Sequence, residues 1–563
     1  MTSFLAGLTA CLALPTAMVF TPWLLVRLLF PRADRDTSLA TMGLAAFLLH
    51  LLAPCLLHLT RIPIDQARLA LLHFTILLLL ALAARLLRRQ LIPAAFRPAP
   101  PQPWLILLLL AILVFPFTHM AGIDTYKWQD MATNLVVEQN IPWLVHPLSL
   151  AGFTPRSYPS LHPLMQGCLA LLGNVGIEGG FWLTSLVIGF TAIFAVNLLA
   201  SLFVRNPSQQ AGLAALYVLA PVFMRYVHWG TGRGVYLAIL PLFIWGLLQL
   251  HRRVGWLMAV VAGLALILSH KAGIPTLLVL LPAMSIGLLL PTRPAWLVPA
   301  MLAGAVAVGT LLAPRWGLTG PAGHLLGFMM KDGQRLGWMG AFMLLGAALY
   351  PHLWGQSRST RACLGGLLAA FPLAHHSEMY GAMLALPFVC IGAWRPLLQL
   401  VTALPHRRAL LLKSAAILTL IGGLTIVVQR SAQATPARVY DAAMFIERIN
   451  PRGPFRVIST GRHGIHIQGY VSGCPRFTLT VTDPHAMAVK PPPRAGEGDL
   501  SQRASAWIGY LRGFLNPPGI STDWYGGART IYHVILDEER ARPPGSLLIY
   551  AEEGVTIFEE TTP

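Results

Sequence analysis

Long apolar segments separated by short polar connections fill the first 430 residues. The segments are apolar on all sides, as in helices surrounded by lipid or protein, and most are long enough to cross about 30 Å of hydrocarbon. We predict fourteen spans, at about residues 3–30, 38–60, 66–86, 103–120, 180–204, 211–226, 234–250, 254–269, 272–291, 296–314, 336–352, 361–374, 378–396 and 410–428. The first has no basic residues before it and is too long for a signal peptide, so we expect it to be retained.

One apolar segment, LHPLMQGCLALLG at residues 161–173, is too short to cross a membrane. We interpret it as an amphipathic helix that lies on the outer interface. Two long outer loops then remain, at about residues 121–179 and 315–335. Long loops in compact proteins are usually functional or disordered, and the aromatic, proline and acidic residues of the first loop argue against disorder.

Arginine and lysine set the orientation, because cytoplasmic loops carry an excess of them. With fourteen spans, all of the basic clusters fall on the cytoplasmic side, and the N-terminus and the tail from about residue 431 lie outside. These clusters contain Arg85, Arg88, Arg89, Arg97, Arg205, Arg252, Arg253, Arg293, Arg358, Arg361, Arg407, Arg408 and Lys413.

The composition agrees with a membrane domain followed by a water-soluble one. Of all residues 55% are hydrophobic and 11% are charged, and the mean hydropathy is +0.62. Nine of the 22 Asp and Glu residues precede residue 431, and 13 lie in the last 133 residues. We therefore predict a polytopic α-helical membrane protein with a C-terminal extracytoplasmic α/β domain, which excludes a cytosolic enzyme, a fibrous protein and a disordered regulator. The net charge of +19 follows from the basic clusters between spans, so we expect no nucleic acid partner.

The tail has the composition of a small α/β domain. ARVYDAAMFIERIN at residues 437–450 predicts a helix. Strand composition occurs in FRVIST, RFTLTVT, TIYHVIL, SLLIYA and VTIFE.

The carboxylates of the membrane portion lie at its surfaces, which argues against a proton relay through the spans. Asp124 is the most suggestive, because it follows a predicted span directly, in HMAGIDTYKWQDMATNL. A carboxylate at the membrane–water boundary suits a general base that deprotonates an acceptor hydroxyl. The alternative is that Asp124 caps the amphipathic helix that follows it.

Basic and imidazole groups also occur on the outer side, against the usual bias. Arg225 and Arg233 lie in MRYVHWGTGRG, and His270 and Lys271 lie in LSHKAG. They are candidates for binding an anionic ligand such as a phosphate. The alternative is that they anchor the chain to lipid headgroups.

A divalent cation such as Mg²⁺ or Mn²⁺ is a further candidate ligand. The segment HHSE offers His375, His376 and Glu378. Adjacent histidines point in different directions on a helix, so this is a weak metal motif.

These features together resemble the GT-C superfamily of polyprenyl-phosphate-dependent glycosyltransferases, which includes protein O-mannosyltransferases and lipid A aminoarabinose transferases. The resemblance covers roughly residues 100–430. An acidic residue at the start of the first outer loop matches Asp124. A Tyr-Pro-Pro-Leu-like stretch matches the segment from Tyr158 to Leu161, and YVHWGTGRGVYLAILPL and LSHKAGIP are similar to later outer segments. The chain then divides into three additional helices (1–102), the GT-C-like domain (103–430) and the soluble periplasmic domain (431–563).

The resemblance implies inverting transfer of a sugar from an undecaprenyl-type phosphate to a cell-envelope acceptor, which is a lipid, a glycan or a protein. Asp124 is then the general base, and Arg225, Arg233, His270 and Lys271 stabilise the leaving phosphate. The acceptor or sugar site contains Asp130, Trp128, Tyr158, His162 and Glu378. The resemblance and the Ala-, Leu-, Pro- and Arg-rich composition place the protein in a bacterial inner membrane, among its lipids.

Three alternatives remain. An O-antigen ligase or polymerase would use a diphosphate-linked donor and would depend on outer Arg and His residues rather than on Asp124. A flippase for lipid-linked sugars would need polar residues along a path through the spans, of which the sequence has few. A non-catalytic subunit would tolerate the substitution Asp124→Asn.

Overall fold

The chain is mostly helical, with a small sheet near its C-terminus. The computed structural model describes residues 2–31, 35–87, 108–110, 123–144, 147–152, 158–289, 358–376, 378–407, scattered helical positions between 410 and 449, and 455–459, 478–481, 520–523, 530–536, 545–552 and 555–561.

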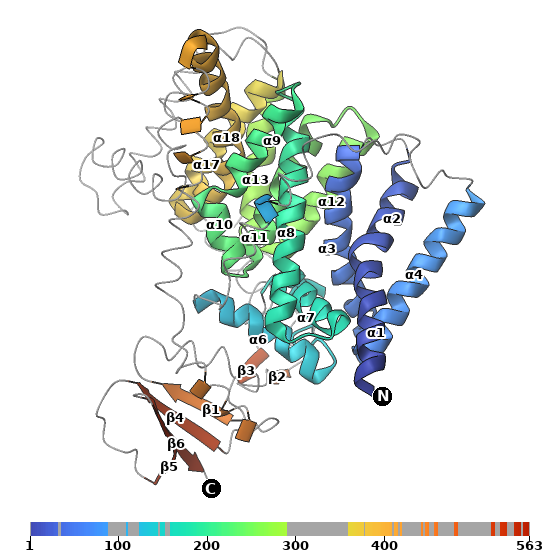
Figure 1. The fold of residues 1–563 in the computed structure, drawn as a ribbon, viewed down its shortest axis with the longest axis vertical. Helices are drawn as coiled ribbons and strands as arrows, with labels where there is room; N and C mark the ends of the chain where they lie inside the picture. The colour runs from blue at the N-terminus through green and yellow to red at the C-terminus, as the bar shows by residue number, and fades with distance from the viewer. Residues whose placement is uncertain are drawn as a thin grey trace, which may run out of the picture.

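Three apolar segments at the N-terminus form a helical unit beside the main bundle (Figure 1). The first is one long helix with a π-helical turn in its middle. The helices of this unit are α1 (Thr2–Pro15), η1 (Thr16–Phe20), α2 (Thr21–Leu29), α3 (Arg35–Leu59) and α4 (Gln66–Leu86). The helix α4 begins sharply because the Asp65 side chain caps it by accepting a hydrogen bond of 2.8 Å from the backbone N–H of Arg68.

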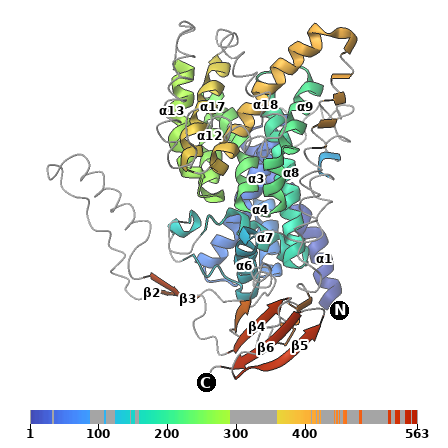
Figure 2. The same ribbon diagram turned by 90° about the vertical axis from the view of Figure 1, so that its left-hand side faces the viewer.

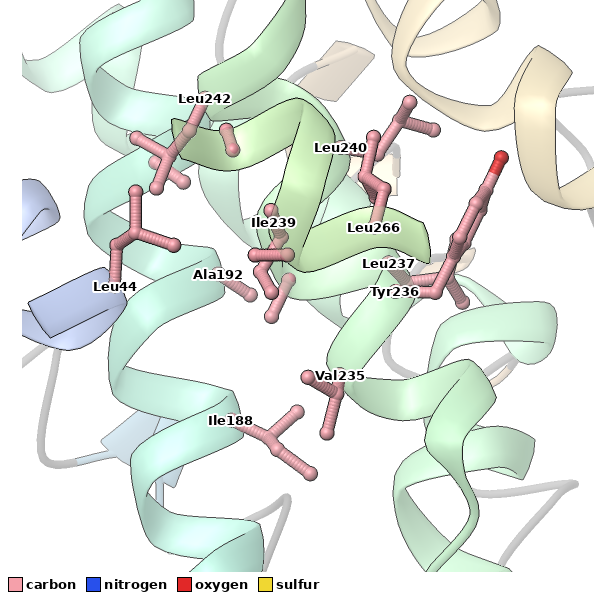
Figure 3. Close-up of a cluster of buried hydrophobic side chains, with 14 of the residues drawn as sticks. Leu44, Ile188, Ala192, Val235, Tyr236, Leu237, Ile239, Leu240, Leu242 and Leu266 are labelled. Atoms are coloured by element: carbon pink, nitrogen blue, oxygen red, sulfur yellow. The ribbon is translucent and has the colours of Figure 1, made fainter. Parts of the chain in front are cut away.

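The main bundle is built around α8 (Ile177–Ala200), which packs against α3, α9 and α11. Its other helices are α9 (Pro207–Val218), α10 (Pro221–His228), α11 (Gly232–Leu248), α12 (Arg253–Ser269), α13 (Gly273–Leu289), α17 (Arg358–His376) and α18 (Glu378–Ala403), followed by the short 3₁₀ turn η4 (Pro405–Arg407). Figure 3 shows one layer of the core, where Leu44 of α3, Ala192 of α8, Ile239 of α11 and Leu266 of α12 lie among other apolar side chains.

Small residues allow the helices of this core to approach closely. A Cβ atom added at Gly43 of α3 would lie 2.2 Å from the Oγ1 atom of Thr191 on α8. Close contact at small residues is typical of helix packing in membranes. The N-terminal unit is therefore joined to the bundle through the α3–α8 crossing.

Four described helical segments are long and apolar enough to cross a membrane: Ala6–Leu29, Thr37–Leu59, Gln66–Leu86 and Ile177–Ala200. They agree with the spans predicted at 3–30, 38–60, 66–86 and 180–204. The predicted spans at 103–120, 296–314, 336–352 and 410–428 lie wholly or largely outside the described residues. The count of fourteen spans and the division at residues 102 and 430 stay predictions.

One predicted span, 211–226, is broken in two. The helices α9 and α10 meet at an angle of 60°, and they are long enough to span a membrane only when taken together. The residue before Pro221 is Ala220, whose φ of −61° and ψ of 137° are extended. Proline disfavours the helical conformation of the residue before it, so the helix ends there and restarts in a new direction.

The interpretation of residues 161–173 is half right. A helix, α7 (Leu161–Gly173), occurs at these residues, but it does not have the exposed polar face of an interfacial amphipathic helix. Every residue from Leu161 to Ala170 is buried, because α3, α6 (Ile123–Glu138) and α8 surround the helix. A helix that is apolar nearly all round is one that packs in a core.

Strands form two small sheets in the C-terminal part. The larger has the order β1 (Phe455–Ser459), β4 (Thr530–Leu536), β6 (Val555–Thr561) and β5 (Leu547–Glu552), in which β1 and β4 are parallel and the other pairs are antiparallel. The smaller pairs β2 (Thr478–Val481) with β3 (Ile520–Asp523). The sequence predicted five of these strands. Only scattered helical positions of the predicted helix 437–450 are described, so the complete α/β domain stays a prediction.

Figures 1 and 2 show the strands β4, β5 and β6 at the end of the molecule where α1 begins and where α6 and α7 lie. The predicted topology also puts the N-terminus, the first outer loop and the tail on one side.

Candidate functional site

The first wall of the site is α6, whose buried face packs on α7. Trp128, Ala132 and Leu135 lie on this face and are buried. A Cβ atom at Gly167 of α7 would lie 2.6 Å from the Cδ2 atom of Leu135, so the two helices are in close contact. Asp124 occupies the first turn of α6, four residues before Trp128, a spacing that puts both positions on the same side of the helix. The side chains of Asp124 and Asp130 lie outside what the structure describes.

Hydrogen bonds hold the segment before α7 in place. The Trp143 Nε1–H donates to the Ser160 Oγ atom at 3.0 Å, and the Ser160 backbone N–H donates to the Leu150 carbonyl at 2.8 Å. Gly152 has a φ of +77°, and a Cβ atom there would lie 2.7 Å from Pro159. Glycine is needed at this turn, which fixes the backbone next to Tyr158.

Three aromatic rings meet between α6 and α7. The ring centroids of Trp128 and Tyr158 are 5.7 Å apart, and those of Trp128 and His162 are 5.7 Å apart in an edge-on arrangement. Burial lowers the pKa of His162 to about 3, so its ring is neutral. Neither of its nitrogen atoms has a hydrogen-bond partner among the described residues.

Lys271 and His270, from the turn between α12 and α13, lie beside these rings. The Lys271 Nζ atom lies 4.6 Å from the centroid of the Tyr158 ring, within the range of a cation–π interaction, and the lysine is exposed. Its neighbour His270 is buried. The Ala272 backbone N–H donates to the His270 Nδ1 atom at 3.1 Å, so in the neutral ring the proton is on Nε2.

The pKa of His270 reflects the burial of its ring and the two cations nearby. Burial first, and then the charges of Arg233 and Lys271, lower this pKa to about 3. His270 is therefore a neutral hydrogen-bond donor in a positive environment at pH 7. We call Trp128, Tyr158, His162, Arg233, His270 and Lys271 together the outer cluster.

The third cation, Arg225, lies beside this group. The Arg233 guanidinium carbon is 5.3 Å from the Tyr226 ring centroid, and that of Arg225 is 5.0 Å from the Trp229 ring centroid. The Tyr226 and Trp229 centroids are 5.7 Å apart. Arg225 is thus connected to Arg233 through two aromatic rings.

Gly232, at the start of α11, packs against Trp128 of the outer cluster. A Cβ atom at Gly232 would lie 2.0 Å from the Ser269 carbonyl oxygen and 2.8 Å from the Trp128 ring. Gly232 therefore lets α6, α11 and the end of α12 meet at one point.

Two tyrosines that the sequence analysis did not single out also contact His270. The Tyr380 ring of α18 is edge-on to His270 at 5.3 Å, and the Tyr236 ring of α11 is at 6.3 Å. The Tyr236 hydroxyl is 2.6 Å from the Thr276 Oγ1 atom of α13. The segment SEMY places Tyr380 two residues after Glu378, and this proximity to a candidate residue is the signal that could have identified it.

The candidate metal ligands fall where the structure describes only the backbone. His375 and His376 end α17, and Glu378 begins α18. Within the described part of the chain, no group of three or more His, Cys, Asp or Glu side chains is arranged to hold a metal ion. The cation site at these three residues stays a prediction.

No protein-family model matches the sequence, and no curated protein sequence matches it. Two solved structures are similar in fold. An Archaeoglobus fulgidus oligosaccharyltransferase, in complex with zinc and sulfate, aligns over 76% of this chain and 67% of its own, with 12% identity and a TM-score of 0.46. The Archaeoglobus fulgidus oligosaccharyltransferase AglB, in complex with an inhibitory peptide and a dolichol-phosphate, aligns over 77% and 69%, with 12% identity and a TM-score of 0.44.

Proposed function

We propose that the protein is a membrane glycosyltransferase that moves a sugar from an undecaprenyl-type phosphate to an acceptor on the extracytoplasmic side of a bacterial inner membrane. The observation that carries this proposal is the outer cluster. Arg233, at the start of α11, meets His270 and Lys271, from the turn between α12 and α13, beside the helix on which Asp124 lies, one turn from Trp128.

The cations suit a phosphate that leaves with additional negative charge. The Lys271 ammonium and the Arg233 guanidinium attract the phosphate oxygens, and the Nε2–H of neutral His270 donates a hydrogen bond to one of them. His270 is buried, so its hydrogen bond to the phosphate is stronger than it would be in water. Arg225 extends the positive surface behind Arg233.

The aromatic side chains suit a sugar ring. The half-buried Tyr158 ring lies next to Lys271, where the sugar joins the phosphate, and the buried Trp128 ring packs against both Tyr158 and His162. Asp130 and Glu378 are the candidates for positioning the acceptor. If a divalent cation takes part, His375, His376 and Glu378 are the residues that would hold it, and it would neutralise part of the phosphate charge.

The reaction is a single displacement at the anomeric carbon. Asp124 takes the proton of the acceptor hydroxyl while its oxygen bonds to that carbon. The bond from the carbon to the phosphate oxygen breaks, and its electron pair stays on the phosphate. Attack from the face opposite the leaving group inverts the anomeric configuration.

The experiment uses purified protein in lipid vesicles with a panel of polyprenyl-monophosphate sugars, and a cell-envelope extract as acceptor. Mass spectrometry follows the release of free polyprenyl phosphate. We expect acceptor-dependent release with one donor. Release only from a diphosphate-linked donor would indicate a ligase or polymerase, and movement of intact donor across the bilayer without release would indicate a flippase; either result contradicts the proposal.

A further inference from the structure

Two fully buried histidines that are not part of the outer cluster lie against each other in the N-terminal unit. His50 lies on α3 and His73 on α4, and their ring centroids are 5.4 Å apart with an interplanar angle of 40°. Ionisable residues inside membrane helices are costly to bury and usually serve a function. The glycosyl transfer proposed above makes no use of them.

The tautomer of His50 is fixed by its neighbours. Its Nδ1 atom is 2.7 Å from the Ala46 carbonyl oxygen, which only accepts hydrogen bonds, so Nδ1 carries the proton. Its Nε2 atom then has a free lone pair. Histidines that bind metals typically donate Nδ1–H to a backbone carbonyl and coordinate through Nε2.

The remaining ring nitrogens have no partner in the part of the chain that the structure describes. These are His50 Nε2 and both nitrogens of His73, and all three are buried. A buried polar atom without a partner costs about 1–3 kcal/mol. One nitrogen of a neutral His73 carries the ring proton, so the pair offers two free lone pairs, one from each ring, and these indicate that something else binds there.

The spacing fits one shared ion. Imidazole nitrogens lie about 2.0–2.1 Å from a bound metal, which puts each ring centroid roughly 3 Å from it and two centroids at most about 6 Å apart. The observed 5.4 Å lies within that limit.

The apolar surroundings and the neutral ligands favour an ion that carries a single charge. Among the described residues no third His, Cys, Asp or Glu completes a group with these two, so the ligands are two neutral imidazoles. A divalent ion would keep its whole charge in an apolar interior, which is strongly unfavourable. Copper(I) has a single charge and accepts imidazole and soft ligands.

Two local features mark the place as unusual. The π-helical η1 contacts both α3 and α4, and π-helical turns are frequent at functional sites. The Cys168 thiol of α7 donates to the His50 carbonyl at 3.8 Å. We propose that His50 and His73 bind one copper(I) ion between α3 and α4 of the N-terminal unit.

The test titrates the whole metal-free protein in detergent with copper(I), without oxygen and with a competing chelator. Bound metal is measured by mass spectrometry, and its ligands by X-ray absorption. We expect one ion per chain with two nitrogen ligands, and a loss of at least tenfold in affinity for His73→Leu. His73→Met supplies a thioether, which copper(I) accepts, and retains binding. His251→Gln, at an exposed histidine in the turn before α12, leaves binding unchanged.

A stability measurement accompanies the titration. In His73→Leu an apolar side chain takes the place of a buried imidazole that has no hydrogen-bond partner. Without metal, this variant should therefore unfold at the same temperature as the wild type or at a higher one. The wild type, His73→Met and His251→Gln gain stability when copper(I) is added, and His73→Leu does not. Absence of binding in the folded wild type, or equal binding by folded His73→Leu, would overturn the site.

Discussion

At the scale of single residues, the outer cluster depends on the protonation state of His270. Burial and the nearby charges of Arg233 and Lys271 keep its pKa at about 3, compared with 6.5 for an unperturbed histidine. The ring therefore acts as a neutral donor through Nε2 and not as a cation. We expect no step in the pH profile of transfer that comes from this residue between pH 5 and 8.

Two substitutions test this role. His270→Gln keeps a neutral N–H donor and retains most of the transfer rate, whereas His270→Ala lowers it by roughly tenfold or more, because a hydrogen bond to a charged group is lost. The measurement is the initial rate of polyprenyl phosphate release. Equal loss in both variants would contradict a role as a donor.

The same shift makes stability depend on pH. As the pH falls from about 6.5 to about 3, the unfolded chain binds a proton at His270 before the folded protein does. The contribution of this residue to the free energy of unfolding therefore falls with decreasing pH across that window. Thermal unfolding of His270→Gln between pH 6.5 and 4 should show a smaller decrease in Tm than the wild type.

Tyr158 positions the Lys271 ammonium. Tyr158→Phe keeps the ring face and should leave donor binding nearly unchanged, whereas Tyr158→Leu removes the cation–π interaction, worth about 0.5–1 kcal/mol at an exposed site, and weakens binding about two- to fivefold. In a background of Lys271→Met, the leucine substitution should have no further effect on donor affinity, and a full additional loss would argue against this contact.

At the scale of elements, the sequence predicts the limits of a helix where its apolar run ends at an Arg, Pro or Asp residue. The helix predicted at residues 66–86 has the same limits as α4, and in the structure Asp65 caps its first turn. The break before Pro221 was missed because the apolar run continues across it. The burial of α7 and the strand β3 were also missed, since neither segment shows by its own pattern what packs around it.

The site itself was predictable in part. Sequence proximity and resemblance grouped Trp128, Tyr158 and His162, and the structure brings them together with Lys271. The contact of Trp128 with Gly232 joins segments about 100 residues apart, and no local pattern encodes it.

The meeting of α6, α11 and α12 depends on Gly232. Gly232→Val should force the Ser269 backbone and the Trp128 ring apart, which lowers stability by about 1–3 kcal/mol and reduces transfer. The matched control is Gly7→Ala in α1, where a Cβ atom meets nothing within 4 Å. Thermal unfolding and transfer rates of both variants provide the check. A valine variant as stable and active as the control would contradict this packing.

At the scale of the whole molecule, the predicted topology puts the outer cluster and the tail on one side of the membrane. A cysteine at residue 271 or 441 should react with an impermeant maleimide added to intact spheroplasts, and a cysteine at residue 252 only after permeabilisation. Cys11, which is exposed, and Cys474, in the tail, are removed beforehand. Labelling of residue 252 in intact spheroplasts would contradict the orientation.

The central claim is that Asp124 is the base of a glycosyl transfer, and the most direct measurement is single-turnover transfer by Asp124→Asn beside Asp441→Asn, an exposed carboxylate of the tail. Donor binding is measured on the same samples. We predict that Asp124→Asn binds the donor with wild-type affinity and loses at least a hundredfold in transfer rate, the usual contribution of a general base, while Asp441→Asn is unchanged. Transfer by Asp124→Asn at the wild-type rate would contradict the claim.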